Sequence, residues 1–332
     1  MDRVNVCLAG TGWTASNHFA GYSAIPQKAC VAAVVAHSDA SAARAAEVWK
    51  VKRVYRSFEE ALKDDGIQAF DICTPHYHHA EMVVAALGSG RHVMVETPAC
   101  TSAEECRALR IALFEHPGLK AATGHICRSW PTYGRAKQIV ESGSFGKVFY
   151  LSSDYAHRSD PDEYPSARTW GRNPRARVGM GISYHSVDLL RWMAGEVEEV
   201  SGELTDRARI AVLRFREGAL GHVFQSGSVV GPYSLPLHVY GESGTINCFW
   251  EEQTLKGRLH TSSDWNPEAL PVTPLHGRGS PEWIYEMTDF IDSILQDGQP
   301  VCPLLEGIKT VETCMSIEEA MRFGGRVRVR YS

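Results

Sequence analysis

The N-terminal stretch constrains this chain more than any other part of it. An apolar run from Val4 to Leu8 is typical of a strand buried on both faces of a sheet. The run ends at a G-x-G-x-x-A pattern formed by Gly10, Gly12 and Ala15, and a helix-like stretch follows. Gly10 permits a tight turn, Gly12 lets backbone amides approach a pyrophosphate, and Ala15 lets the helix pack against the strand. The pattern therefore predicts a dinucleotide at the helix N-terminus.

Strands and helices alternate regularly after this first unit. The expected strands are Val31–Ala36, Ala69–Cys73 and His92–Val95, with one intervening helix opened by Ser57–Glu60 and a later one capped by Thr101 with Glu104. Such alternation is typical of a parallel, doubly wound sheet. Many glycine-rich turns bind no ligand, but the βαβ spacing around this one favours dinucleotide binding.

The pattern changes near residue 124. A helix is expected from Pro131 to near Gly143, and a strand from Lys147. The later expected elements are strands Ala208–Phe215, Ala219–Gln225, Leu237–Tyr240 and Gly244–Phe249, and helices Pro281–Leu295 and Leu305–Arg322. We therefore predict an α/β protein with a Rossmann domain over 1–124 and an α/β domain with an open, mostly antiparallel sheet over 125–332. Packing of the C-terminal helices back on the first domain is left open.

Composition excludes several classes of protein. A length of 332 residues suits about two domains. The net charge of -5 leaves no basic footprint for nucleic acid. No apolar run approaches the ~18 residues of a membrane helix, and the N-terminus enters a strand directly, so no signal peptide is expected. The nine cysteines form no C-x-x-C pair, which favours reduced thiols and a cytoplasmic protein.

Further motifs extend over nearly the whole chain. They are Gly10 and Gly12; Thr74-Pro75 with His79; Gly90–Val93 leading to Glu96 and Pro98; Gly124, Arg128 and Pro131; Gly143 and Gly146; His185 with Asp188; Gly218–Gly221; Gly241, Gly244 and Thr245; and Asp289–Ile294. In this order they resemble the glucose–fructose oxidoreductase/inositol dehydrogenase family, written Gfo/Idh/MocA. The resemblance implies NAD(P)-linked chemistry, usually on sugars or cyclitols, and homo-oligomers (dimers or tetramers) formed through the open sheet.

The cofactor contacts are predicted from the fold and this resemblance together. They are Gly10, Thr11, Gly12, Trp13, Thr14, His37, Ser38, Thr74, Pro75, His76, His79, Glu96, Thr97, Arg128, Trp170 and Arg172. Trp170 and Arg172 are similar to the family's Trp-Arg pair, although Gly171 separates them here. At the tip of the second strand an acid selects NAD, and Arg or small polar groups admit NADP. The tip is His37-Ser38, with Asp39 beyond it, so the sequence leaves NAD and NADP open.

The departures from the family pattern concern catalysis. Family members usually have Lys between the Glu and the Pro, where this chain has Thr97. They usually have Asp four residues before the helix histidine, where this chain has Gly181. An Asn often follows the Thr-Pro pair, where this chain has His76. Only the histidine of the usual Lys–Asp–His set is kept, as His185.

His185 is the candidate base, although a structural helix histidine is the ordinary alternative. Alcohol oxidation needs a base for the hydroxyl proton and a group that stabilises the developing oxyanion, and an imidazole has its usual pKa near neutrality. Asp188, one turn further on, is expected to orient or tune the ring. Thr97 donates a hydrogen bond without charge, and losing a cationic donor costs about 1.5–3 kcal/mol. Tyr184, Ser183 and Arg128 are candidate substitutes.

Two other clusters have competing interpretations. Cys73, His76, His78 and His79 straddle a strand-to-helix turn with no carboxylate in register, so no metal site is predicted. Arginines gather between residues 157 and 179. These are Arg158, Arg168, Arg172, Arg175 and Arg177. They form either a solvated loop or a surface for an anionic substrate, and the sequence does not separate the two.

The sequence leaves three hypotheses for function. The first is an NAD(P)-dependent oxidoreductase of a sugar-like or other small cyclic hydroxy or keto compound, acting by hydride transfer. The second keeps NAD tightly held and uses transient oxidation to drive elimination or glycoside cleavage, with His185 or Tyr184 as base. The third is a non-catalytic cofactor or sugar sensor, which the missing Lys and Asp would permit.

Overall fold

The first sheet is parallel and doubly wound. The computed structural model describes residues 3–158, 182–231, 233–249, 254–259, 266–268 and 281–332. Its six strands run in the order β3-β2-β1-β4-β5-β6. They are β1 (Val4–Ala9), β2 (Ala29–Val35), β3 (Arg53–Tyr55), β4 (Ala69–Ile72), β5 (His92–Val95) and β6 (Ala121–Thr123). The predicted Rossmann sheet is thus confirmed. The strand order reverses between β1 and β4, which places a crevice at their carboxyl ends.

Helices connect these strands. They are α1 (Trp13–Ser23), α2 (Asp39–Glu47), α3 (Phe58–Ala61), α4 (His79–Gly88) and α5 (Ala103–Glu115), with short 3-10 turns η1 (His76–His78) and η2 (Ile126–Ser129). The expected start of α5 was one residue too early. Ser102 is the residue whose hydroxyl accepts from a first-turn amide, that of Glu105, at 3.2 Å, whereas Thr101 donates to the Glu105 carboxylate.

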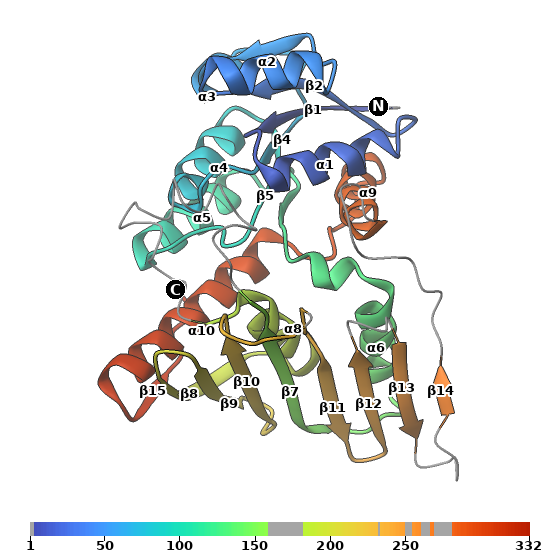
Figure 1. Cartoon of the computed structure of the whole chain (residues 1–332), viewed down its shortest axis with the longest axis vertical. Coiled ribbons are helices and arrows are strands. Elements are labelled where there is room, and N and C mark those ends of the chain that lie inside the picture. The colour runs from blue at the N-terminus through green and yellow to red at the C-terminus, as the bar shows by residue number, and fades with distance from the viewer. Residues whose placement is uncertain (1–2, 159–181, 232, 250–253, 260–265, 269–280) are drawn as a thin grey trace.

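The second sheet is open and mostly antiparallel, as predicted. Its order is β14-β13-β12-β11-β7-β10-β9-β8-β15, and β7–β10 is its parallel pair (Figure 1). The strands are β7 (Val148–Ala156), β8 (Val197–Leu204), β9 (Arg209–Phe215), β10 (Leu220–Ser226), β11 (Leu237–Gly241), β12 (Gly244–Phe249), β13 (Thr254–Leu259), β14 (Asn266–Glu268) and β15 (Arg326–Arg328). Helices α6 (Pro131–Glu141), α8 (Tyr184–Ala194) and α10 (Leu304–Phe323) pack against the strands.

The other face of the second sheet carries exposed apolar side chains. In β9, Ala211, Leu213 and Phe215 are buried, while the alternate residues Ile210 and Val212 are more than one-third exposed. This alternation follows from the two-residue period of a strand. Tyr150, Leu220 and Tyr240 lie in register across β7, β10 and β11 and are exposed as well.

Helix α9 (Pro281–Leu295) lies beside α1, far from its neighbours in sequence (Figure 1). A Cβ on Gly21 of α1 would come within 2.8 Å of both Trp283 and Met287, so glycine permits the close approach of these helices. Met287, Phe290 and Ile291 share a core with Val4 and Val6. The described part of the chain contains no helix long and apolar enough to cross a membrane.

Candidate active site

The two glycines after β1 serve different purposes. Gly10 has φ +115°, and a Cβ there would come within 2.6 Å of the carbonyl oxygen of Cys73, so the protein itself requires glycine. Gly12 precedes α1, and a Cβ there would have no neighbour within 4 Å. Space therefore lies open at the N-terminus of α1, where backbone amides favour phosphate. Thr11, Trp13 and Thr14 adjoin Gly12 in sequence, and their contact with a pyrophosphate stays a prediction.

Two arginines lie near the carboxyl end of β2. His37 and Ser38 are exposed, and the Ser38 hydroxyl accepts a bond from the Ser41 amide at the start of α2. Arg56 donates to the carbonyl oxygen of His37 at 3.0 Å and pairs with the exposed Asp39. Arg44 reaches the carbonyl oxygen of Thr11 at 3.5 Å. Two guanidinium groups therefore lie where the adenosine ribose of a dinucleotide binds in this fold.

The histidines that follow β4 turn to different partners. The ring nitrogens of buried His79 lie 2.8 Å from the carbonyl oxygens of Pro98 and Thr74, so His79 links the loops after β4 and β5. Burial lowers the pKa of His79. His78 lies 2.6 Å from Glu81, and His76 is buried. Thr74 and Pro75 follow the carboxyl end of β4, where a dinucleotide binds in folds of this kind.

A buried ionic cluster lies beneath the crevice, and the sequence interpretation missed it. Nδ1 of His18 in α1 is 2.8 Å from Asp71 Oδ2, and its Nε2 is 3.0 Å from Glu96 Oε1. Burial acts to lower the pKa of His18, but Asp71 and Cys73 outweigh it and raise that pKa well above its usual value. The sequence signal was Asp71, a charged residue inside the otherwise apolar strand β4.

Donor atoms of His18, Asp71 and Cys73 lie within 4.8 Å of one another, a spacing that a metal ion can also use. Both nitrogens of His18 are already engaged by carboxylates. A hydrogen-bonded imidazolium therefore accounts for the cluster without a metal.

Glu96 connects this cluster to Thr97. Its Oε2 accepts from the Thr97 amide at 3.0 Å. A Cβ on Gly124 would come within 3.2 Å of the Glu96 carboxyl, so the absence of a side chain at Gly124 makes room for it. Thr97 itself is half-buried at the end of β5. The carboxylate is thus held in place by His18 on one side and by the backbone of its own loop on the other.

His185 projects from the first turn of α8. Its ring centroid lies 6.1 Å from that of His125, with the rings perpendicular, and 6.0 Å from that of Tyr155 in β7. Its Nδ1 has no hydrogen-bond partner within the described ranges. Burial lowers the pKa of His185, although Glu96 and Asp188 act against this. The ring is therefore neutral at neutral pH and can accept a proton.

Other candidate substitutes lie elsewhere. Tyr184 is buried, and burial with the nearby Cys314 and Glu318 raises its pKa well above the usual value. These neighbours place its hydroxyl toward α10, so the structure does not bring Tyr184 to His185. The Ser183 hydroxyl accepts from the Ser186 amide and caps α8.

Arg128 and Asp188 form a buried, two-pronged ion pair. Nε and Nη2 of Arg128 donate to the two Asp188 oxygens at 2.7 and 2.8 Å, and the Thr310 hydroxyl donates to the same carboxylate at 3.0 Å. Burial acts to raise the pKa of Asp188, but the Arg128 guanidinium holds it well below its usual range. Arg128 is 4% exposed, so its charge is committed to Asp188 rather than to a cofactor or an oxyanion.

The expected role of Asp188 also changes. Its carboxylate approaches His125 at 3.8 Å, whereas no hydrogen bond joins it to His185. Trp170, Arg172 and Gly181 lie outside the described residues, as do Arg168, Arg175 and Arg177.

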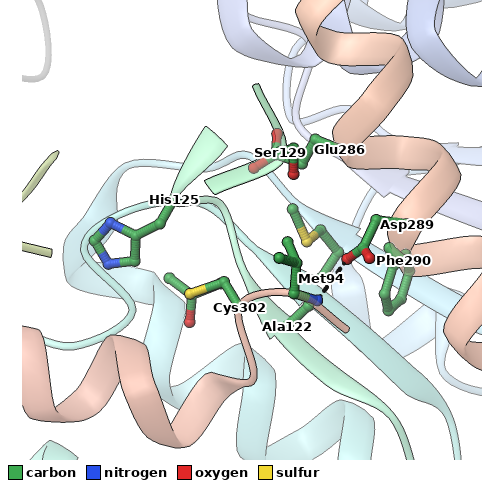
Figure 2. A pocket seen from close by; sticks show the side chains of 10 residues that line it. Met94, Ala122, His125, Ser129, Glu286, Asp289, Phe290 and Cys302 are labelled. Carbon is green, nitrogen blue, oxygen red and sulfur yellow. Dashed lines mark hydrogen bonds between the residues drawn. The ribbon is translucent and has the colours of Figure 1, made fainter. Parts of the chain in front are cut away.

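A small cavity lies between α9 and the first sheet (Figure 2). Ser129 and Glu286 line one part of it, and Asp289, which accepts from the Val301 amide at 2.8 Å, lines another. Burial raises the pKa of Asp289 to about 6. The cavity has room for about one water molecule and is too small for a sugar.

Two family models match the chain in sequence order. Residues 4–125 match an oxidoreductase family model with an NAD-binding Rossmann fold, and residues 133–247 match the GFO/IDH/MocA C-terminal domain. Together the matches cover more than half of the chain.

Named relatives agree with these models. Levoglucosan dehydrogenase of Pseudarthrobacter phenanthrenivorans is 27% identical over 62% of this chain and 55% of that protein. NAD(+)-dependent scyllo-inositol 2-dehydrogenase of Bacillus subtilis is 27% identical over 56% of each. The match thus spans about half the length of these relatives.

Solved structures share the fold. A levoglucosan dehydrogenase in complex with NADH and levoglucosan has a TM-score of 0.89 at 21% identity, covering 99% of this chain and 100% of that one. The apo scyllo-inositol dehydrogenase from Lactobacillus casei has a TM-score of 0.80 at 19% identity, covering 99% and 98%. Because the two family models match the chain one after the other, this chain belongs to the GFO/IDH/MocA family of NAD-binding Rossmann oxidoreductases.

Proposed function

We propose that this protein is an NAD(P)-dependent dehydrogenase of a sugar-like or other small cyclic hydroxy compound, with His185 as the base. The observation that carries the proposal is the neutral imidazole of His185, whose Nδ1 has no hydrogen-bond partner in the described part of the chain and whose ring lies 6.0 Å from that of Tyr155 and 6.1 Å from that of His125. A base that is uncharged at neutral pH can take the hydroxyl proton as the C–H bond gives up its hydride. The relatives named for levoglucosan and scyllo-inositol support this substrate class.

The nicotinamide cofactor supplies the hydride acceptor when it is bound. The open space at Gly12 fits its pyrophosphate. Glu96, fixed by His18, keeps the loop of Thr97 in place at the end of β5. Thr97 offers a neutral hydroxyl where most family members have Lys, so we expect oxyanion stabilisation here to be weaker than with a cation.

For the cofactor, we propose weak selectivity or a preference for NADP. Arg44 and Arg56 lie beside His37 and Ser38, and the nearby Asp39 already pairs with Arg56. Guanidinium groups favour a 2′-phosphate by forming charge-assisted hydrogen bonds to it.

We also propose that the protein forms homo-oligomers through the open face of the second sheet. Large apolar side chains on β7, β9, β10 and β11 are exposed on it, among them Tyr150, Ile210, Val212, Leu220 and Tyr240. Exposed apolar side chains gathered on one face of a folded chain favour protein–protein contact.

The test of function has two steps. The purified protein is denatured and any released nicotinamide is identified; it is then assayed with sugars, cyclitols and their keto forms by reduced-nicotinamide absorbance. Oxidation of a hydroxy compound with stoichiometric formation of reduced cofactor supports the proposal. Substrate turnover without net change in reduced cofactor would instead indicate redox-assisted elimination. Binding of cofactor with no turnover of any compound would indicate a sensor.

A further inference from the structure

His125 is a buried histidine to which the sequence interpretation assigned no role. It follows β6 and is 1% exposed. Neither of its ring nitrogens has a hydrogen-bond partner among the residues that the structure describes. Buried polar groups are nearly always hydrogen-bonded, because an unpaired one has lost its water without replacement. An imidazole in this condition is suited to receive a polar group from a ligand.

The surroundings of His125 place it on the side of His185. The two ring centroids are 6.1 Å apart and the rings are perpendicular. His125 is one of the residues that line the small cavity, and Figure 2 shows its ring extending on the side away from Glu286 and Asp289. The ring therefore points toward the part of the molecule where we place the reacting group.

Asp188 sets which nitrogen of His125 carries the proton. The Asp188 carboxylate, fixed by Arg128, lies 3.8 Å from Nδ1 of His125. A negative charge on this side favours Nδ1–H and leaves Nε2 as a hydrogen-bond acceptor. Burial lowers the pKa of His125 to about 3, with Asp188 acting in the opposite direction and His185, Arg128 and Arg191 adding to the decrease. The ring therefore stays neutral at physiological pH and accepts a hydrogen bond rather than a proton.

We propose that His125 is a specificity-determining residue, which accepts a hydrogen bond from the hydroxyl next to the one that is oxidised at His185. Gauche oxygens on adjacent ring carbons are separated by about one hydrogen-bond length, so such a vicinal pair can bridge two imidazoles at this spacing. The substrate class is thus a cyclic compound with two neighbouring hydroxyls. One hydroxyl gives its proton to His185 and its carbon gives a hydride to the oxidised nicotinamide, while the second hydroxyl keeps its proton and only binds. This inference rests on the proposed function.

The test compares a vicinal diol that the enzyme oxidises with the deoxy analogue that lacks the neighbouring hydroxyl. The variants are His125→Leu, which removes the acceptor, and His125→Asn, which keeps one. His92→Gln is the control, since His92 is a partly buried histidine at the amino end of β5, where its Nδ1 accepts from the Lys120 amide. Folding is checked by thermal unfolding, and cofactor affinity by titration with reduced nicotinamide dinucleotide.

A site built to bind a hydroxyl rejects the analogue without it by a large factor. We expect wild type and His92→Gln to prefer the diol by about a hundredfold or more in kcat/KM. His125→Leu should lose that factor on the diol and nothing on the deoxy compound, and His125→Asn should restore part of it. Cofactor affinity should stay unchanged in all variants.

Three results would overturn the inference. Equal losses on diol and deoxy compound would make His125 a structural residue, and an unchanged preference in a folded His125→Leu would remove it from the site. If His125→Leu fails to fold, an unchanged preference in His125→Phe, which keeps a ring but has no acceptor nitrogen, has the same meaning. Wild-type protein that binds cofactor and oxidises neither compound overturns the proposed function together with this inference. This outcome is distinguished from failure of the inference alone, because it is already observed in the wild type without any variant.

Discussion

Nδ1 of His18 lies 2.8 Å from Oδ2 of Asp71, and both side chains are fully buried between α1 and β4. This contact joins the helix proposed to face the cofactor phosphates to the strand at the centre of the Rossmann sheet. Because the other ring nitrogen of His18 is hydrogen-bonded to the Glu96 carboxylate, the same imidazolium also fixes the loop that carries Thr97. Stability and active-site geometry therefore depend on one buried charge.

The stability contributed by His18 should decline at alkaline pH. Its folded-state pKa is raised above the unfolded value of about 6.5. The contribution is therefore complete below about pH 6.5 and is lost as the pH rises through the folded-state pKa. His18→Gln should lower the free energy of unfolding by about 3 kcal/mol or more at the low end of the pH range, because it leaves buried carboxylates without their partner. Denaturant unfolding of both proteins across pH measures this. A difference that grows with pH would contradict it, and His78→Gln, at an exposed pair, is the control.

The two loop glycines should separate folding from binding. Gly12→Val should leave the fold intact and abolish binding of NAD, NADH, NADP and NADPH, because its side chain enters space that only the ligand needs. Gly10→Ala should lower the free energy of unfolding by about 1–3 kcal/mol, because φ +115° and the Cys73 carbonyl both oppose a Cβ. Calorimetric titration and thermal unfolding report the two effects. Unchanged cofactor affinity in Gly12→Val would show that this loop does not bind the pyrophosphate.

Cofactor choice should follow the arginines beside β2. We expect any preference for NAD over NADP to stay below about a hundredfold, ~2.7 kcal/mol. Arg44→Ala and Arg56→Ala should each weaken NADP binding about tenfold while changing NAD binding little, since each removes a charge-assisted contact to the 2′-phosphate. Arg107→Ala, at an exposed pair on α5, serves as the control. Equal losses for both cofactors would assign these arginines to the fold.

Removing His185 should reduce turnover without loss of cofactor. General-base loss costs about 10²–10⁴ in rate, so His185→Ala should fall by this factor, and Thr97→Ala by much less, since a neutral donor contributes about 0.5–1.5 kcal/mol. A base must be unprotonated, and burial lowers the His185 pKa. The acid limb of kcat/KM should therefore lie below pH ~6.5. Equal pH–rate profiles for wild type and His185→Ala would exclude this role.

Thr97→Lys tests whether the pocket still oxidises alcohols in the manner of its family. Restoring the cation should hold or raise the rate if an oxyanion develops beside it. A buried Lys without such a partner should instead lower stability or binding. Steady-state kinetics on the substrate found by screening, with thermal unfolding alongside, separates these outcomes.

The oligomer should dissociate when its proposed interface is charged. Val212→Glu places a carboxylate in the centre of the exposed apolar face of β9, where burial against a second copy would be unfavourable. Glu199→Gln, on the neighbouring strand β8, is the control, because it removes a carboxylate and adds no charge. Sedimentation velocity should show a smaller particle for Val212→Glu only. A wild-type monomer would contradict the proposal.

Local sequence determined much of the fold. The predicted bounds of His92–Val95, Gly244–Phe249 and Pro281–Leu295 coincide with β5, β12 and α9, because each segment has a clear period or turn boundary. The Rossmann sheet was predicted from the alternation of strands and helices. The turn between β1 and α1 was predicted from the spacing of Gly10 and Gly12. Where a boundary slipped, as at Thr101 and Ser102, two adjacent hydroxyl residues offered the same cap and only the hydrogen bonds distinguished them.

The tertiary structure alone decided which side chains meet. His18 and Asp71 are 53 residues apart, and Arg128 and Asp188 are 60 apart, so no local period relates them. Asp188 lies one turn from His185, and spacing predicted that it orients or tunes the ring. The packing of α8 against η2 joins Asp188 to Arg128 by hydrogen bonds, so Asp188 acts on the pKa of His185 through its charge and does not orient the ring by a hydrogen bond. A helix places neighbours on one face, but a buried charge is held by whichever opposite charge the packing brings into hydrogen-bond distance.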